Sequence, residues 1–435
     1  MRDLAFALVI LAVFPLALAR PFNAYLLWGW TGMLAPTAYF YGFMAEARIN
    51  LVMALTTIGL VLLGRVKWID YQKNRVSWWY LIFALHATMA FLFGYKNNPF
   101  NAQYYDILIK GLIFCLFMPF FVRDRIHFHS MVIAIVLGLG IHGAFNGLKT
   151  LASAGGHNMT GPEGTMISDR NHLSMALAMV LPIIYYLHAY TERRWVRLVL
   201  LGGFCTVVLA ILGGGSRAGF VTLAVVGLWL ILTSPKKGLA LLLFGLAAIL
   251  FWAYAPQEWT SRLSTISEAK EDESFMGRMI AWEISSAIGL AHPIIGGGFH
   301  AVQIQAVWEA FKETPGLLSF MSLPVPGPVA KAAHSIYFEL LGDMGFVGLF
   351  LFLCIMAQAF FSRLSIARMA KQLGQSFRWA HDMANMLLLS VLAFMVGGTT
   401  VSLSYFEVIY MIIMLLELLR VHVKRCLHGQ AVRLL

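Results

Sequence analysis

Long apolar stretches dominate the chain, and short polar connections separate them. A helix needs about 20 apolar residues to cross a bilayer, so each stretch predicts one membrane-spanning helix. The predicted spans are 3–19, 50–64, 78–95, 104–122, 128–150, 171–190, 194–213, 217–233, 236–254, 334–361, 383–399 and 401–420. A further stretch, 24–44, is apolar too, but its Trp28, Trp30 and Pro36 also suit an interfacial or re-entrant segment. The pattern predicts an all-α polytopic membrane protein with about twelve transmembrane helices.

Composition agrees with this class. Of the 435 residues, 60% are hydrophobic and only 12% are charged, against about 25% charged in soluble domains. The first span is as short as a signal peptide and follows Arg2, but hydrophobic spans follow it throughout, so we interpret it as a retained helix. The net charge of +11 comes mostly from short loops, so it does not indicate nucleic-acid binding.

Basic residues fall in alternate loops, which predicts the orientation. The basic clusters are 65–75, 123–125, 193–197, 236–237, 363–378 and 420–425. By the positive-inside rule these loops and the C-terminus are cytoplasmic. If Arg2 is also inside, the number of spans is even, which favours twelve. If 24–44 crosses, the N-terminus is outside and the number is thirteen.

One long extramembrane segment, 255–333, falls on the outer, periplasmic side in this orientation. Its pattern predicts a helix over 276–290, a glycine-rich turn over 292–300 and a second helix over 301–313. The proline-rich PVPGP then breaks the chain before His334. We therefore expect three regions: N-terminal transmembrane helices in 1–254, a periplasmic cap in 255–333, and C-terminal transmembrane helices with a cytoplasmic tail in 334–435.

Four arginines depart from the charge rule because they lie on the outer side. They are Arg170 in SDRNHLS, Arg217 in GGGSRAG, and Arg262 and Arg278 in the cap. An arginine near the bilayer centre costs about 2.5–3.5 kcal/mol on insertion scales. Each could simply contact lipid phosphates. Taken alone, Arg262 is better explained as a solvated residue of the cap than as a binding residue. As a set on the face that presents His334, they favour binding of an anionic substrate.

The GGGSRAG motif has a mechanical interpretation. Its glycines end one span, Ser216 can cap the next helix, and Arg217 enters the first turn. Backbone N–H groups and a guanidinium at a helix start suit phosphate oxygens. The glycines alone would also fit a tight helical hairpin that binds no ligand, so it is the arginine that indicates phosphate binding.

His334 begins another motif, HSIYFELLGDMGFVG, at the outer end of a span. A histidine there can simply bond a backbone group. Gly342, Gly345 and Gly348 follow at a spacing of three, which predicts close approach of a neighbouring helix and a rigid setting for the histidine. Glu339 and Asp343 lie one turn apart on a different face, and the sequence leaves open whether they pair with a cation or line a polar cavity.

These motifs together resemble the bacterial O-antigen ligase and polymerase superfamily over about 165–350. His334-Ser335 followed by Gly345 and Gly348 is similar to its H-[N/S]-x9-G-x-x-G pattern. The cap is similar to its R-x3-W…HP-x-x-G-x-G stretch, at Arg278, Trp282, His292-Pro293, Gly296 and Gly298. The resemblance implies a GT-C-like glycosyltransferase of the bacterial inner membrane with a periplasmic active site. Such an enzyme moves a glycan from undecaprenyl diphosphate to an acceptor and inverts the anomeric configuration.

The resemblance also implies roles for the residues. Arg170, Arg217, Arg278 and Arg262 would hold the diphosphate and stabilise its growing charge. His334 would be the catalytic base that takes the proton of the acceptor hydroxyl. A diphosphate is a good leaving group and needs no general acid. We see no acidic pair in the first outer loop, so we expect no metal and no other cofactor.

Among the activities of the superfamily, the sequence favours an O-antigen ligase, because one large cap leads directly into His334. The expected partners are an undecaprenyl-diphosphate-linked glycan donor, a lipid A-core acceptor and membrane lipids, with no nucleic acid. An O-antigen polymerase or a protein O-oligosaccharyltransferase of the same superfamily stays open. A different class, a lipid-linked oligosaccharide flippase or exporter, would also need arginines for diphosphate. A transporter needs polar groups in both leaflets, so charges gathered on one side favour an enzyme.

Overall fold

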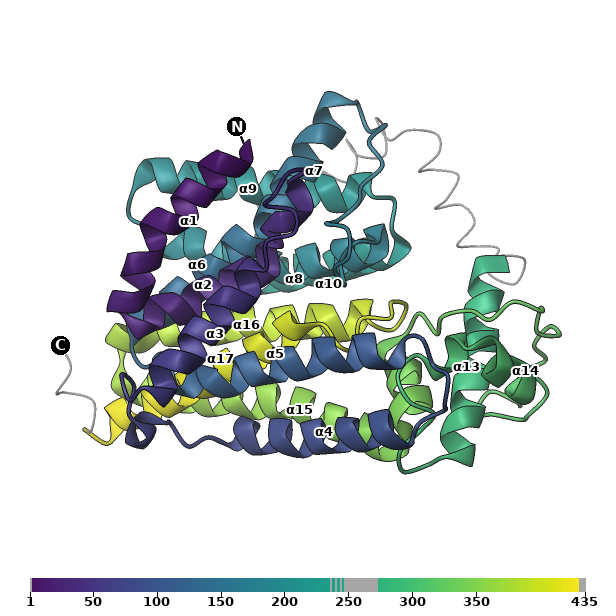
Figure 1. Cartoon of the computed structure of the whole chain (residues 1–435). Helices are drawn as coiled ribbons and strands as arrows, with labels where there is room; N and C mark the ends of the chain where they lie inside the picture. Colours follow the sequence, from purple (N-terminus) through teal and green to yellow (C-terminus); the bar gives the residue numbers. More distant parts are fainter. Residues whose placement is uncertain (1, 235–236, 239–240, 243–244, 246–272, 430–435) are drawn as a thin grey trace.

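The computed structural model describes residues 2–234, 237–238, 241–242, 245 and 273–429, and every regular element within these ranges is helical (Figure 1). The α-helices, with the π-helix η3 between α6 and α7, are α1 (Arg2–Ala19), α2 (Pro21–Leu34), α3 (Ile49–Leu62), α4 (Arg75–Phe93), α5 (Asn101–Phe121), α6 (Arg125–Ile135), η3 (Val136–Gly140), α7 (Ile141–Ala152), α8 (Arg170–Tyr190), α9 (Arg194–Gly213), α10 (Arg217–Thr233), α13 (Glu273–Ala291), α14 (Gln305–Phe311), α15 (Ile336–Leu373), α16 (Arg378–Gly397) and α17 (Glu407–Leu427). The short 3-10 helices are η1 (Pro36–Tyr39), η2 (Trp68–Asp70), η4 (Ala301–Gln303) and η5 (Gln375–Phe377).

Within the described residues, eight helical stretches are long and apolar enough to cross a membrane. They are Arg2–Ala19, Arg75–Phe93, Asn101–Phe121, Arg125–Ala152, Arg170–Tyr190, Arg194–Gly213, Ile336–Leu373 and Gln375–Gly397. The helices α3 and α10 are apolar but shorter. This confirms an all-α polytopic membrane protein. Twelve spans and a GT-C-like fold stay predictions, and most of the expected span 236–254 lies outside the described residues.

Several boundaries differ from the sequence prediction. The last span was expected over 401–420, but residues 401–406 form a connection and α17 starts at Glu407. The helix after His334 was expected to end at 361, and α15 continues to Leu373, so much of the basic loop 363–378 is helical. Apolar pattern alone places a helix but not its ends, because charged side chains can extend a helix beyond the membrane.

The ambiguous segment 24–44 forms α2 and the short η1. The Asp3 carboxylate accepts hydrogen bonds from the N–H groups of Gly42 and Met44, each at 3.2 Å. The start of α1 therefore lies beside the connection between α2 and α3. This back-and-forth course of α1, α2 and α3 is the arrangement that the thirteen-span alternative requires.

The basic loops 65–75, 123–125 and 420–425 meet at one end of the helix bundle. The Arg425 guanidinium donates to Gln72 Oε1 at 2.9 Å, Arg123 pairs with Asp70 at 3.3 Å, and the ring of His422 lies 2.9 Å from Arg123 O. The cap helices α13 and α14 lie at the opposite end (Figure 1). The arrangement fits the alternation of basic loops, and which compartment each end faces stays a prediction.

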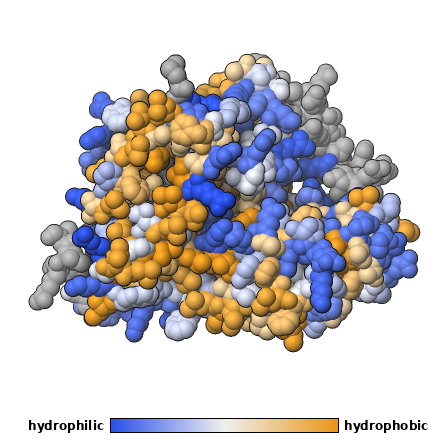
Figure 2. Space-filling model, viewed as in Figure 1, coloured by the Kyte–Doolittle hydropathy of each residue, from blue (hydrophilic) through white to orange (hydrophobic). Residues whose placement is uncertain are grey.

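The long helix α15 connects the two parts that matter for the site. It packs against α4, α16 and α17 in the bundle and against α13 in the cap. Apolar side chains cover much of the face shown in Figure 2, and polar side chains interrupt them near its middle.

Candidate functional site

His334 lies in the turn that leads from the cap into α15. Its backbone is left-handed, with φ of 46°, a conformation that costs a non-glycine residue free energy and persists only where its surroundings impose it. Hydrogen bonds of the neighbouring residues restrain the backbone before and after His334. Trp282 Nε1 of α13 donates to Ala333 O at 2.6 Å, and the N–H of Ile336 donates to Gly398 O at 2.8 Å. His334 is thus held between α13 and the end of α16.

His334 shares a cavity with one of the predicted arginines. The cavity has a volume of about 290 Å³ and is lined by Gly277, Arg278, Lys331, Ala332 and His334. Arg278 comes from α13, so the cap and the start of α15 form this site together. Lys331 is a second cation that the sequence reasoning missed, although it precedes His334 by only three residues.

The electrostatics of the cavity keep the imidazole neutral. Burial and the nearby positive charge of Arg278 lower the pKa of His334 to about 4, and Asp169 acts in the opposite direction. His172 also contributes to the lowering, so the first turn of α8 lies near His334. Near neutral pH the imidazole is therefore unprotonated.

Arg170 and Arg217 each occupy the first position of a helix. Asp169 caps α8 by accepting a hydrogen bond from the Asn171 N–H at 2.7 Å. Ser216 caps α10 by accepting from the Gly219 N–H at 3.2 Å, which confirms its predicted role. Neither arginine lines the cavity that holds His334.

The starts of α8 and α10 are nevertheless packed against the helix end that supports His334. A Cβ atom at Gly397 in α16 would lie 2.6 Å from Thr222 of α10 and 3.1 Å from Met175 of α8. A Cβ atom at Gly398 would lie 2.4 Å from Ile336. Whether the arginine side chains at these helix starts share one cavity with His334 stays a prediction, and Arg262 lies outside the described residues.

A break in α15 follows the site. Gly345 has φ of 67° and ψ of −171°, a conformation that glycine alone adopts readily. Breaking the helix frees backbone carbonyls, and a segment of the cap binds two of them: Gly297 N–H donates to Gly342 O at 2.8 Å and Gly298 N–H donates to Asp343 O at 2.9 Å. On the far side of the break, the Phe346 N–H donates to a carbonyl of the same segment at 2.8 Å.

We call residues 292–298 the clasp, because they hold this break. Pro293 supplies the carbonyl that Phe346 binds, and His86 of α4 completes the set with its Nε2 atom 3.0 Å from Met344 O. The predicted glycine pattern is therefore only partly a packing surface. Gly342 allows α13 to pack closely, because a Cβ atom there would lie only 3.3 Å from Ser285. Gly345 instead provides the backbone conformation of the helix break.

The sequence left open whether Glu339 and Asp343 pair with a cation or line a polar cavity. In the structure, both belong to a buried network of hydrogen bonds. The Ser404 N–H donates to Glu339 Oε2 at 3.0 Å, and Tyr405 Oη donates to Asp343 Oδ2 at 2.6 Å. Glu339 Oε1 also lies 3.2 Å from Nε2 of His300, whose pKa burial lowers to about 3. The two carboxyl groups join the cap and the α16–α17 connection to α15. Across the described residues, no three His, Cys, Asp or Glu side chains are placed to hold a metal ion.

Comparison with known families agrees with the geometry. Residues 203–353, which include Arg217, Arg278, the clasp and His334, match a family described as O-Antigen ligase. The match supports membership of the O-antigen ligase and polymerase superfamily. Members of this superfamily are glycosyltransferase-like membrane enzymes that use lipid-linked glycans. Residues 1–192, which include Arg170, match a family of unknown function (DUF5935). Among curated proteins, no sequence matches the chain.

Proposed function

We propose that this protein is an O-antigen ligase of the bacterial inner membrane. It transfers a glycan from undecaprenyl diphosphate to a sugar hydroxyl of lipid A-core at the periplasmic face, inverts the anomeric configuration and needs no metal. The observation that carries the proposal is the cavity in which Arg278 and a neutral His334 lie together, at the end of the bundle opposite the basic loops.

The proposed step uses these two groups in different roles. Arg278, with Lys331 beside it, binds the diphosphate of the donor, and Arg170, Arg217 and Arg262 complete the binding of its charge. The acceptor oxygen bonds to the anomeric carbon while its proton moves to the imidazole of His334. The bond from that carbon to the diphosphate oxygen breaks, and its electron pair leaves with the diphosphate. Attack opposite the leaving group accounts for inversion.

Donor binding should strengthen the base. With a pKa of about 4, His334 is a weak base in the free protein, partly because Arg278 is positively charged. A bound diphosphate neutralises that charge, which removes one of the two main causes of the lowered pKa. The pKa of His334 then rises toward its ordinary range, where a general base works best. The protein thereby acquires its base when the donor is in place.

The lipid A-core is the proposed acceptor because a single cap leads directly into His334. An O-antigen polymerase would use a second lipid-linked glycan as acceptor, and a protein O-oligosaccharyltransferase would use a protein. A flippase or exporter would use no acceptor at all. The position of Arg278, Lys331 and His334 at one end of the bundle favours transfer over transport.

Purified protein and an undecaprenyl-diphosphate-linked glycan provide the test. Separate reactions receive lipid A-core, a second lipid-linked glycan or a pilin-type protein, and the product is followed by mass spectrometry, with His334→Ala as the inactive control. We expect glycan on lipid A-core. Transfer to either other acceptor would replace the ligase by the corresponding activity, and energy-linked translocation without transfer would establish the exporter.

A further inference from the structure

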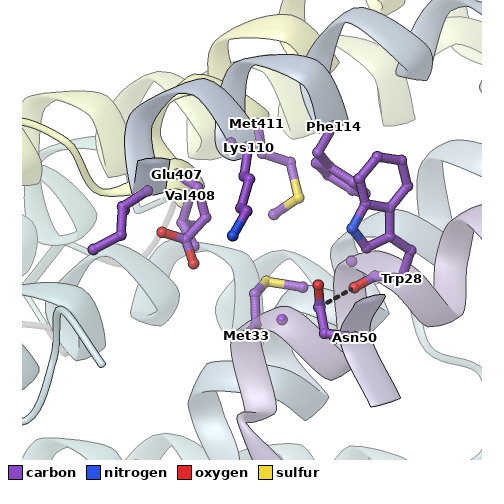
Figure 3. Close-up of a pocket in the computed structure, with 12 residues that line it drawn as sticks. Trp28, Met33, Asn50, Lys110, Phe114, Glu407, Val408 and Met411 are labelled. Atoms are coloured by element: carbon purple, nitrogen blue, oxygen red, sulfur yellow. Dashed lines mark hydrogen bonds between the residues drawn. The ribbon is translucent and has the colours of Figure 1, made fainter. Parts of the chain in front are cut away.

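A second cavity lies between α2 and α3 on one side and α5 and α17 on the other. It has a volume of about 190 Å³. Trp28, Met33 and Phe114 form an apolar wall, and Lys110 and Glu407 direct their charged groups into the space (Figure 3). The apolar wall with two opposite charges is suited to a small amphipathic group.

The level of this cavity in the membrane follows from helix lengths. The Tyr25 ring near the start of α2 stacks on Phe121 at the end of α5, with ring centroids 4.8 Å apart, so the start of α2 is level with the end of α5. The helix α2 ends beside Lys110. From Lys110 to the outer end of α5 at Asn101 there remain nine residues (110 minus 101), or about 14 Å of helix. The short α2 and α3 thus cover only part of the length of α5, and a step is left where α2 ends below the outer end of α5.

Such a step draws lipid headgroups inward. The helices α2 and α3 have 14 residues each, or about 21 Å, against a hydrocarbon core of about 30 Å. A bilayer next to a span that is too short becomes thinner, which lowers the polar headgroups toward the end of that span. At the end of α2 they would meet the cavity with Lys110 and Glu407.

The charges around the cavity specify which headgroup fits. The Lys110 ammonium pairs with Asp106 at 2.5 Å, and both side chains are more than half exposed. Within the part of the chain that the structure describes, no cation lies within ion-pair distance of the Glu407 carboxylate. An intramembrane carboxylate without a cation is costly and by default indicates a binding function. One ammonium and two carboxylates together favour a ligand that brings both a phosphate and a cation.

We propose that this cavity binds the headgroup of an aminophospholipid from the outer leaflet. The lipid phosphate contacts the Lys110 ammonium, and the primary amine donates to the Glu407 carboxylate. The glycerol side lies against Trp28 and Phe114. An anionic lipid without an amine, such as phosphatidylglycerol, satisfies Lys110 and leaves Glu407 without a partner. The site is separate from the glycan-transfer site, and its occupancy does not depend on the transfer reaction.

Native mass spectrometry of the purified full-length protein tests the site, with phosphatidylethanolamine and phosphatidylglycerol titrated in parallel. One charge-assisted hydrogen bond corresponds to about tenfold in affinity, so we expect about tenfold tighter binding of phosphatidylethanolamine. Glu407→Gln should remove this preference, and Lys110→Met should weaken the binding of both lipids. Glu46→Gln and Lys96→Met, which neutralise exposed charges in the connections before α3 and before α5, are the matched controls and should bind like the wild type.

Two results would overturn the proposal. One is equal binding of both lipids by the wild-type protein. The other is a Glu407→Gln variant that elutes as folded protein and keeps the preference for phosphatidylethanolamine. If Glu407→Gln does not fold, Glu407→Asp provides the second measurement: it keeps the charge but shortens its reach, and it should retain the preference with reduced affinity. A Glu407→Asp variant without any preference would also contradict the assignment.

Discussion

Replacing Gly345 by alanine tests whether the clasp depends on the break in α15. A Cβ atom at this position would lie 2.6 Å from Pro293 O and 2.8 Å from His292 O, and the backbone conformation is strained for any residue but glycine. Holding alanine in that conformation costs about 1–3 kcal/mol. Straightening the helix instead loses three backbone hydrogen bonds at about 0.5–1.5 kcal/mol each. We therefore expect Gly345→Ala to weaken docking of the clasp by about 2–4 kcal/mol.

Hydrogen exchange measures this change directly. Opening that is easier by about 2–4 kcal/mol raises exchange of the amides in the clasp by about 30- to 1,000-fold. Gly342→Ala should have a smaller effect, because its Cβ meets Ser285 at 3.3 Å, and Gly202→Ala should have almost none, because nothing lies within 4 Å of its Cβ. The reasoning fails if Gly345→Ala exchanges at the wild-type rate, or if all three variants change alike.

Four further predictions concern the transfer reaction. His334→Ala should slow transfer by about 10²–10⁴-fold while donor binding survives, measured by transfer assay and donor titration; combined loss would instead place His334 among the donor-binding groups. As the pH is lowered, kcat/KM, which reports the free protein, should decrease near pH 4 because protonation of His334 removes the base. The corresponding decrease in kcat should occur at higher pH, because the bound donor neutralises Arg278. A decrease of both constants near pH 6.5 would contradict this. Arg217→Ala should lose more transfer activity than Arg217→Lys, and neither should match the wild type, because lysine cannot make a bidentate phosphate contact; equal activity of all three would remove Arg217 from the site. Transfer should persist in EDTA, and its loss with recovery in Mg²⁺ or Mn²⁺ would reveal a metal site.

The sequence predicted those features that depend on local pattern. Apolar length gave most of the helices, and the order Ser216-Arg217 gave a capped helix start that the structure confirms. The motifs around Arg278 and His334 indicated one site, and these two side chains do line one cavity. In each case a residue and its close neighbours contain the whole signal.

Features that depend on distant contacts were missed or left open. A glycine spacing of three suits helix packing and a helix break equally well, and only the clasp, about 50 residues earlier in the chain, makes Gly345 a break. The partners of Glu339 are His300 and Ser404, 39 and 65 residues away. Lys331 was overlooked because a lysine near a proline-rich segment is usually solvated, and its role depends on the approach of α13.

The break at Gly345 has a consequence for the construction of chimeras. Residues 336–344 continue into the bundle, yet the clasp binds the carbonyls of Gly342 and Asp343 at their end, so this outer part of α15 is tied to the cap. A cap transplanted from a relative and joined at residue 334 would arrive without the helix end that it binds. A graft that runs through Gly345, and that brings the 398–405 connection with it, would transfer the interface whole. Exchange of acceptor preference between relatives should therefore follow these boundaries rather than the membrane surface.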